Sequence, residues 1–148
     1  MVLHGLGGDD TLTGSNQADL PFGNAGDDSL AGLDSADLIE GGRGDDLVAW
    51  NEPAGDLAFG GNGKDTLHGS NVVADSILGG GGDDRMRVFA TTAAAGTASA
   101  LLSGGGGDNV CDYNDDAVVG RDLLIDFNVL GDVIRLSNLK PDFEPLRR

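Results

Sequence analysis

One aspartate recurs about every nine residues over most of this sequence, each time at the end of a short glycine-rich or polar stretch. The series is Asp10, Asp19, Asp28, Asp37, Asp46, Asp56, Asp65, Asp75 and Asp84, and Asn109 has the same place further along. A carboxylate is a hard oxygen ligand that suits Ca²⁺, and aspartate is short enough for tight turns. The spacing therefore predicts rows of cation ligands in a repetitive fold.

The clearest copy of the repeated unit is GGRGDDLVA, residues 41–49. Its glycines allow the positive φ angles of a tight loop. Asp46 ends the loop, and Val48 supplies one apolar side chain two positions later. The apolar position is filled in turn by Leu12, Pro21, Leu30, Ile39, Val48, Ala58, Leu67, Ile77, Met86 and Cys111. A short fixed period of this kind predicts a solenoid, in which each unit buries its apolar residue by stacking on its neighbours.

The pattern G-G-x-G-x-D followed by three strand residues resembles the RTX (repeats-in-toxin, haemolysin-type) calcium-binding family. The same repeats form the β-roll of serralysin-type proteases and the R-modules of mannuronan epimerases. The resemblance covers 5–112 and implies an all-β, right-handed parallel β-roll (β-solenoid) with two nonapeptides per turn. It implies several Ca²⁺ ions, each shared by loops on successive turns through the aspartates and backbone carbonyls near motif positions 2 and 4. The carbonyls are those of Leu6, Gly8, Asn24, Gly26, Gly42, Gly44, Gly61, Gly63, Gly80 and Gly82.

Alternate loops differ in quality. The loops that begin at Gly5, Gly23, Gly41, Gly60 and Gly79 are rich in glycine, whereas the loops between them keep the final aspartate and lose most glycines. If two repeats make one turn, the two kinds of loop lie on opposite edges of the roll. We therefore expect one well-formed row of metal sites and one looser row.

Three features interrupt the period. Pro21 cannot donate a hydrogen bond to a β-ladder. Trp50 is an extra residue between two repeats, which we expect either to pack on the loop edge as a bulge or to form an exposed contact. Residues 88–103 break the repeat, and within them 93–102 could form a short helix or a protruding loop.

After the last repeat, 122–136 alternates apolar and polar residues around a turn, which predicts a hairpin-like pair of strands. This stretch resembles the capping segment that follows the repeats in RTX proteases and epimerase modules. We therefore divide the chain into a β-roll over 5–112, with an insertion at 88–103, and a C-terminal capping segment over 113–148.

The composition narrows the function. The formal net charge is -16, with 25 acidic residues against 9 Lys and Arg, which argues against nucleic-acid binding. One cysteine, Cys111, cannot form an internal disulfide, and no stretch approaches the roughly 20 apolar residues of a membrane span.

No N-terminal signal peptide is visible. The resemblance implies type I-type export and a secreted, extracellular protein. Solenoids need capped ends, and the first repeat begins at Gly5 with no room for a cap before it. We therefore expect this chain to be an excised module or to rest against another domain.

Three functional hypotheses follow. The first is a non-catalytic calcium-binding module that folds on Ca²⁺ after export and stabilises or delivers an attached domain. The second is a module that binds a carbohydrate or a cell surface, similar to alginate-type R-modules, with a surface polysaccharide as partner. The third, a small secreted hydrolase, is disfavoured because no G-x-S-x-G or H-E-x-x-H spacing is present. Zinc lacks its usual Cys and His ligands, and magnesium prefers small octahedral shells.

Overall fold

The computed structural model describes the chain except for residues 51–53, 71–74, 90–99, 115–122, 129 and 138–148. The described residues form fourteen β-strands in two parallel, seven-stranded sheets, and no helix occurs among them. None of them therefore forms a helix that could cross a membrane. The molecule is an all-β parallel β-solenoid, as the sequence predicts.

The odd-numbered strands form one sheet, here named the odd sheet, and the even-numbered strands form the even sheet. The odd sheet contains β1 (Val2–His4), β3 (Leu20–Ala25), β5 (Leu38–Arg43), β7 (Leu57–Asn62), β9 (Ser76–Gly81), β11 (Leu101–Gly106) and β13 (Leu123–Ile125). The even sheet contains β2 (Thr11–Thr13), β4 (Ser29–Ala31), β6 (Leu47–Ala49), β8 (Thr66–Ser70), β10 (Arg85–Phe89), β12 (Val110–Asn114) and β14 (Val133–Ser137).

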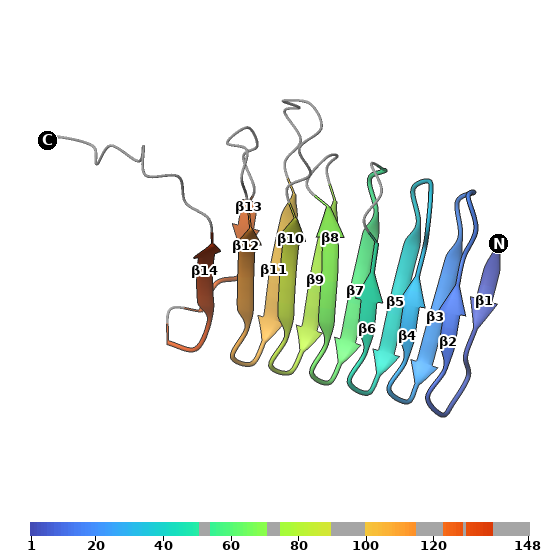
Figure 1. The fold of residues 1–148 in the computed structure, drawn as a ribbon. Coiled ribbons are helices and arrows are strands. Elements are labelled where there is room, and N and C mark those ends of the chain that lie inside the picture. Colours follow the sequence, from blue (N-terminus) through green and yellow to red (C-terminus); the bar gives the residue numbers. More distant parts are fainter. Residues whose placement is uncertain (51–53, 71–74, 90–99, 115–122, 129, 138–148) are drawn as a thin grey trace, which may run out of the picture.

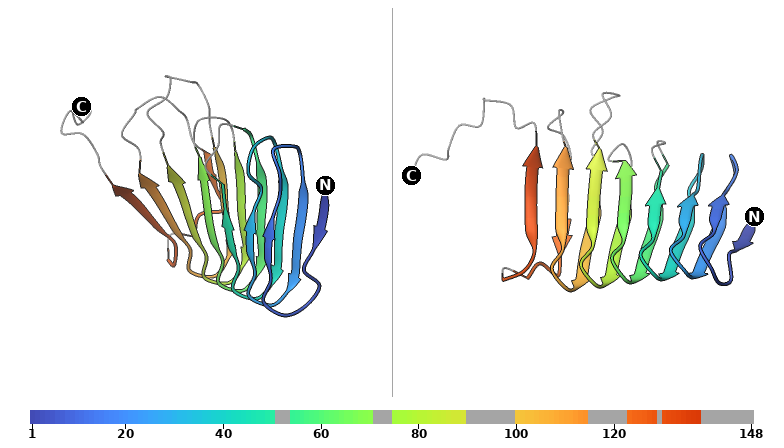
Figure 2. Two further views of the ribbon diagram at one scale, coloured as in Figure 1. Left: turned by 45° about the vertical axis from the view of Figure 1, so that its right-hand side comes forward. Right: turned by 60° about the horizontal axis from the view of Figure 1, so that its bottom comes forward.

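The chain passes from one sheet to the other after every strand, so each turn of the roll adds one strand to each sheet (Figures 1 and 2). Thr11 pairs with Ser29 and Ser29 with Leu47, a step of 18 residues, which equals two nonapeptides. The step becomes 19 at Leu47 and Thr66 because of the extra residue near Trp50. Equivalent motif positions therefore stack in register along the whole roll.

The interior of the roll is filled by one column of apolar side chains from each sheet, and these side chains come from the eighth position of the repeat. Ile39, Val48, Leu67, Ile77 and Met86 have no exposed surface. Strands alternate their side chains between the two faces, so the residues on either side of each core residue point outward. Since only one residue in nine fills the core, the roll is narrow, and its loops carry much of the remaining burial.

The structure shows how the roll accommodates two of the interruptions of the repeat, at Pro21 and at the end of 88–103. Pro21 remains buried in β3, but the recorded register of β3 with β5 begins only at Phe22, as expected for a residue that lacks an N–H group. The repeat resumes at Leu101, where β11 begins and Leu102 enters the core. This corrects the helix or loop that we expect up to Leu102; residues 93–99 lie outside the described part.

The hairpin predicted over 122–136 is wrong. β13 pairs in parallel with β11, and β14 pairs in parallel with β12. The alternation of side chains correctly indicates two strands, but it does not reveal their partners. Each strand instead continues the sheet of its own parity, and the division of the chain at residue 113 stays a prediction.

The core column yields a stability prediction. Leu67→Ala removes a fully buried side chain, and we expect it to lower the free energy of unfolding by about 2–5 kcal/mol. Leu130→Ala is the control because Leu130 is 93% exposed. Denaturant unfolding at saturating calcium measures both variants. Equal stability of the two variants would contradict the assignment of Leu67 to the core.

Candidate metal centre along the glycine edge

The glycine edge is the edge of the roll where each odd strand leads into the next even strand, formed by 5–10, 23–28, 41–46, 60–65, 79–84 and 104–109. These loops lie along the lower edge in Figure 1. The structure stacks the sixth motif residue of every loop into one column. Four of its aspartates have at most 2% of their surface exposed, namely Asp28, Asp46, Asp65 and Asp84.

From Asp28 onward, one oxygen of each carboxylate accepts a hydrogen bond from the turn before it. The backbone N–H of Asp28 donates to Oδ1 of Asp46 at 2.9 Å, and the N–H of Asp46 donates to Oδ1 of Asp65 at 2.9 Å. The same bond joins Asp10 to Asp28 and Asp65 to Asp84. The series therefore continues from turn to turn and fixes each side chain in one orientation.

The other oxygen of each carboxylate has no donor. Oδ2 is buried and accepts no hydrogen bond in five successive turns, at Asp10, Asp28, Asp46, Asp65 and Asp84. Leaving a buried acceptor unsatisfied costs about 1–3 kcal/mol, and more for a charged group. Five orphaned oxygens along one edge are what a row of cation ligands requires.

The glycines of this edge shape the backbone around that column. Gly42, Gly44, Gly61 and Gly63 have φ between 121° and 133°. A Cβ added to Gly61 would collide with the carbonyl oxygen of Gly42, and one added to Gly63 with the carbonyl oxygen of Gly44. The carbonyls of Gly42 and Gly44 thus lie against Gly61 and Gly63 of the next turn, in space that a Cβ at either glycine would fill.

The first two loops build the same backbone without glycine at motif position 2. Leu6 has φ 80° and Asn24 has φ 79°. A left-handed conformation costs a non-glycine residue roughly 1–2 kcal/mol, and Leu6 is also 72% exposed. The loop geometry is therefore imposed by stacking on the neighbouring turn and does not depend on glycine alone.

These features fit calcium. Ca²⁺ takes about 6–8 oxygen ligands from carboxylates and carbonyls together. No group of three or more His, Cys, Asp or Glu side chains converges within the described residues. A cation at this edge would therefore draw on backbone carbonyls as well as on Oδ2 of the column. The residues that would bind it are those the resemblance implies, and their role as ligands remains a prediction.

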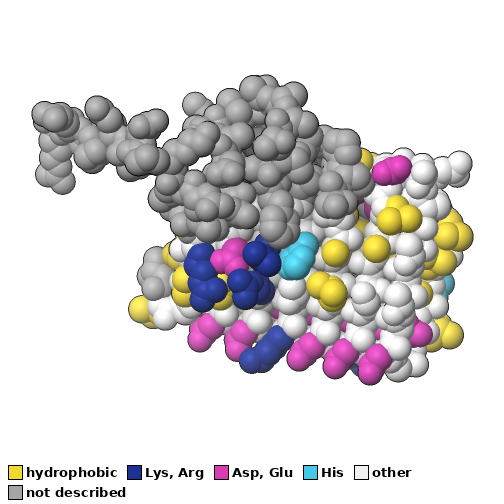
Figure 3. Space-filling model, in the orientation of Figure 1, with side chains coloured by type: hydrophobic (Ala, Val, Ile, Leu, Met, Phe, Trp, Pro, Cys, Tyr) yellow, Lys and Arg dark blue, Asp and Glu magenta, His cyan; other side chains and the backbone are white. Residues whose placement is uncertain are grey.

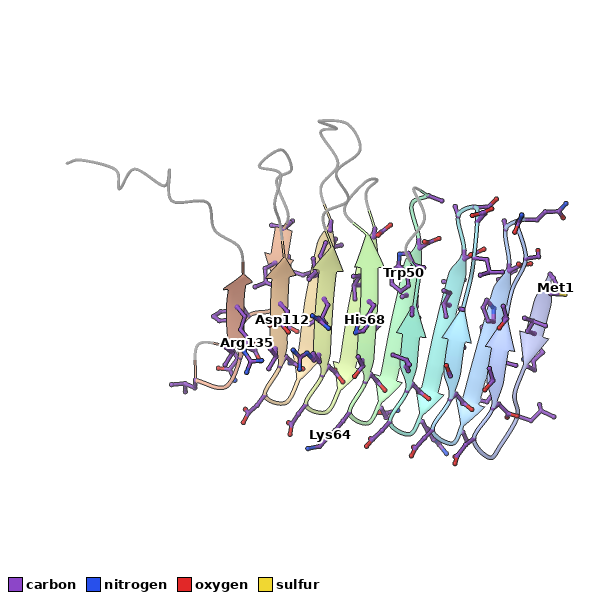
Figure 4. The ribbon with its side chains drawn as sticks, in the orientation of Figure 1. Met1, Trp50, Lys64, His68, Asp112 and Arg135 are labelled. Carbon is purple, nitrogen blue, oxygen red and sulfur yellow. The ribbon has the colours of Figure 1, made fainter. Side chains whose placement is uncertain are left out.

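A second, exposed row of carboxylates runs beside the column and was missed from the sequence. It consists of the fifth motif residues Asp9, Asp27, Asp45, Asp83 and Asp108. Here the bond runs the other way, because Oδ1 of Asp27 accepts the N–H of Asp45, one turn later, at 2.8 Å. Lys64 interrupts the row, and its ammonium group lies 3.2 Å from Oδ2 of Asp83 (Figure 4). The repeated Asp-Asp pair is the sequence signal for this row.

The aspartates of the opposite edge, where each even strand leads into the next odd strand, form a column of their own. Asp19, Asp37, Asp56 and Asp75 are buried, and the N–H of Asp37 donates to Oδ1 of Asp56 at 2.7 Å. Leu101 then donates to the carbonyl of Asp75, and Leu123 to that of Ala100. The aspartate column of this edge therefore ends at Asp75, with Ala100 next in line.

The glycine edge continues further than the sequence indicates. Asn109 is in line, with its Oδ1 accepting the N–H of Asp84 at 2.9 Å and its Nδ2 in place of the second oxygen. Asp132, missed as a candidate, follows it, because its Oδ1 accepts the N–H of Asn109 at 2.8 Å. The phase of Asp132, two residues before Ile134, is the signal that could have revealed it.

Burial changes the acidity of the column. It raises the pKa of Asp46 to about 6 and the pKa of Asp84 to about 7, while neighbouring carboxylates add smaller increases. The pKa of Asp65 is raised for the same first reason. In the metal-free roll these groups therefore keep their protons at a pH where aspartate in an unfolded chain is ionised.

The sign of this shift gives a pH prediction. Below the ordinary pKa of 3.8, the carboxyl groups of Asp46 and Asp84 are protonated in both the folded and the unfolded chain. Above that pH the carboxyl groups ionise freely only in the unfolded chain, so the folded state loses stability as the pH rises toward 7. We expect chelator-treated protein to gain β signal in circular dichroism as the pH falls from about 7 to about 4.

Calcium-loaded protein is the control and should show the opposite trend, because protons compete with the cation for the same oxygens. A chelated protein whose β signal is unchanged over this range would contradict the burial of ionisable carboxylates in the column.

Comparison with known families agrees with this geometry. Residues 2–20, 22–49, 54–71 and 74–87 match the RTX calcium-binding nonapeptide repeat in four copies. Searches of curated proteins and of solved structures found no match. The matched segments make up more than half of the chain and include nine of the ten predicted column positions, with Asn109 outside them. The chain belongs to the RTX calcium-binding nonapeptide repeat family.

Proposed function

We propose that this chain is a calcium-dependent structural module that folds as calcium fills the glycine edge, after type I-type export, and that stabilises or delivers an attached domain. RTX repeat modules are calcium-binding, non-catalytic units, and RTX proteins are typically secreted. The observation that carries the proposal is the row of five buried Oδ2 atoms that accept no hydrogen bond. Calcium that is abundant only outside the cell would delay folding until after export.

Folding and metal binding are expected to be one event. Adjacent strands lie about 4.8 Å apart, so the ionised column places like charges at close intervals. One core residue in nine buries little apolar surface to offset the conformational entropy of the chain. A cation between successive loops would supply the missing partner for each Oδ2 and join neighbouring turns. Binding free energy would then appear as folding free energy.

A calcium titration of chelator-treated protein tests the proposal. We expect a steep gain of β signal in far-UV circular dichroism with Ca²⁺ and little gain with Mg²⁺, which rarely gives up its waters to such a site. The chelated chain should be largely disordered at low ionic strength near neutral pH. A chain that is fully folded without metal and indifferent to calcium would overturn the proposal.

Two variants in the same loop sharpen the test. Asp46→Asn copies the natural Asn109, which keeps the Oδ1 hydrogen bond and loses only the orphaned oxygen. We expect its calcium midpoint to rise about tenfold or more, equivalent to about 1.4 kcal/mol. Asp45→Asn changes the neighbouring exposed carboxylate and is the matched control. Equal midpoints for both variants would mean that Oδ2 of Asp46 does not bind the cation.

A surface feature favours a second candidate function, the binding of an anionic surface polysaccharide. Arg85 and Asp112 form an ion pair on the outer face of the even sheet, and Arg87 Nε and Arg135 Nη1 each lie 3.9 Å from an Asp112 oxygen. Three arginines thus surround one carboxylate in a chain of net charge -16. Figure 3 shows this basic cluster above the row of acidic side chains that runs along the lower edge.

The roll itself brings the cluster together. Arg87 pairs in register with Asp112, and Asp112 pairs in register with Arg135. His68 continues the row on β8 (Figure 4). Burial, followed by the charges of Arg87 and Arg85, lowers the pKa of His68. The cluster therefore depends on the folded roll, and with it on calcium under the first proposal.

Retention on immobilised alginate, with calcium present, tests this second function. We expect the protein to be retained and to elute with salt, and Arg135→Gln to elute at lower salt because it removes one charge while Arg85 still pairs with Asp112. Arg43→Gln, on the odd sheet, is the control for a general loss of positive charge. Equal elution of both variants and the parent protein would exclude the cluster as the binding site.

A further inference from the structure

Two aspartates of the opposite edge differ from those of the glycine edge in the partner of their second oxygen. Oδ2 of Asp75 accepts a hydrogen bond from the indole Nε1 of Trp50 at 3.1 Å, and both residues are buried. Oδ2 of Asp19 accepts the backbone N–H of Ser15 at 2.5 Å and the Ser15 hydroxyl at 2.9 Å. The donors in both cases come from the protein itself.

A backbone hydrogen bond and side-chain packing also hold Trp50 in the place from which it donates to Asp75. Its backbone N–H donates to the carbonyl of His68 at 3.1 Å, and 5% of its surface is exposed. A Cβ on Gly69 would press against the Trp50 ring and against Ile77. The one-residue expansion of the repeat near Trp50 therefore places a large side chain between turns, with its N–H group directed at a carboxylate 25 residues away. Trp50 is thus a buried bulge, and the alternative of an exposed contact is wrong.

A hydrogen-bond donor competes with a cation for a carboxylate oxygen. The hydrogen of an N–H or O–H group carries positive charge and takes one of the two lone-pair directions of that oxygen. The two donors of Ser15 take both directions at Oδ2 of Asp19, and the indole of Trp50 takes one at Oδ2 of Asp75. The loop of Ser15 also lacks the stacked glycines that leave room for carbonyls on the other edge; motif positions 2 to 4 are Ser15, Asn16 and Gln17. At these two positions the carboxylate is already satisfied in the folded chain.

We propose that Trp50 and Ser15 determine where the roll does not bind calcium: their donors close Asp75 and Asp19, which stay metal-free in the calcium-loaded protein. This inference rests on the proposed calcium function of the glycine edge. It removes two of the nine repeating aspartates from the set of ligands that the resemblance implies. It also gives the inserted Trp50 a purpose, as an internal substitute for a cation between two turns.

Calcium stoichiometry of paired variants tests the inference. Asp65→Asn alters an orphaned carboxylate of the glycine edge, and Asp75→Asn makes the same change at the carboxylate bonded to Trp50. Native mass spectrometry at saturating calcium, with circular dichroism as the check on folding, should show fewer bound ions for Asp65→Asn. Asp75→Asn should bind as many ions as the parent protein.

The outcomes separate this inference from the proposed function. A loss of ions in both variants would overturn the inference and leave the glycine-edge sites standing. A full complement of ions in both variants would instead overturn Asp65 as a ligand, and with it the calcium column on which the inference rests.

A second measurement, hydrogen exchange of the Trp50 indole proton, uses the unaltered protein and so does not depend on whether a variant folds. The chain has one tryptophan, so its indole N–H gives a single proton resonance in the unaltered protein. If that proton donates to Asp75 in the calcium-loaded state, it should exchange with deuterium slowly, at least about tenfold slower than in the chelated, disordered chain. Fast exchange in the calcium-loaded protein would mean that the indole has left Asp75, and would overturn the inference.

Discussion

The burial of one carboxylate at each loop is the constraint on which the rest of this roll depends. An isolated buried charge is very costly, and here such groups recur at the spacing of neighbouring strands. The backbone N–H of the preceding turn satisfies one oxygen, as between Asp28 and Asp46. The second oxygen must find a cation, a proton or a donor from the chain. The fold and its ligand chemistry are therefore two aspects of one column of side chains.

The aspartates of the two columns meet this constraint in different ways. In the glycine-edge loops of 41–46, 60–65 and 79–84 the backbone has no side chains at motif positions 2 and 4, so carbonyls face the next turn and the second oxygen remains open. At two positions of the opposite edge, Asp75 and Asp19, Trp50 and Ser15 supply donors. We infer that the first arrangement favours metal and the second favours a permanent protein contact. One repeat thus supports two ways of satisfying the same carboxylate.

The repeat also separates the tasks of its positions. The sixth residue forms the column, the eighth fills the core, and the seventh and ninth lie on the outer faces of the sheets. Because the outer positions carry neither task, they can vary along the roll, from Thr13 and Ala31 near one end to Arg87, Asp112 and Arg135 near the other. Surface charge can therefore change without disturbing the column or the core.

The sequence alone determined whatever repeats with the period of nine: the parallel roll, the aspartate columns, the core residues and the loops that need positive φ. These features follow from local spacing, because stacking in register turns one motif into a column. The sequence did not reveal the partners of β13 and β14, the place of Asp132, the Trp50–Asp75 hydrogen bond or the arginines around Asp112. Each of these joins residues on different turns. Insertions of unequal length between turns decide which residues meet, and only the tertiary structure establishes that register.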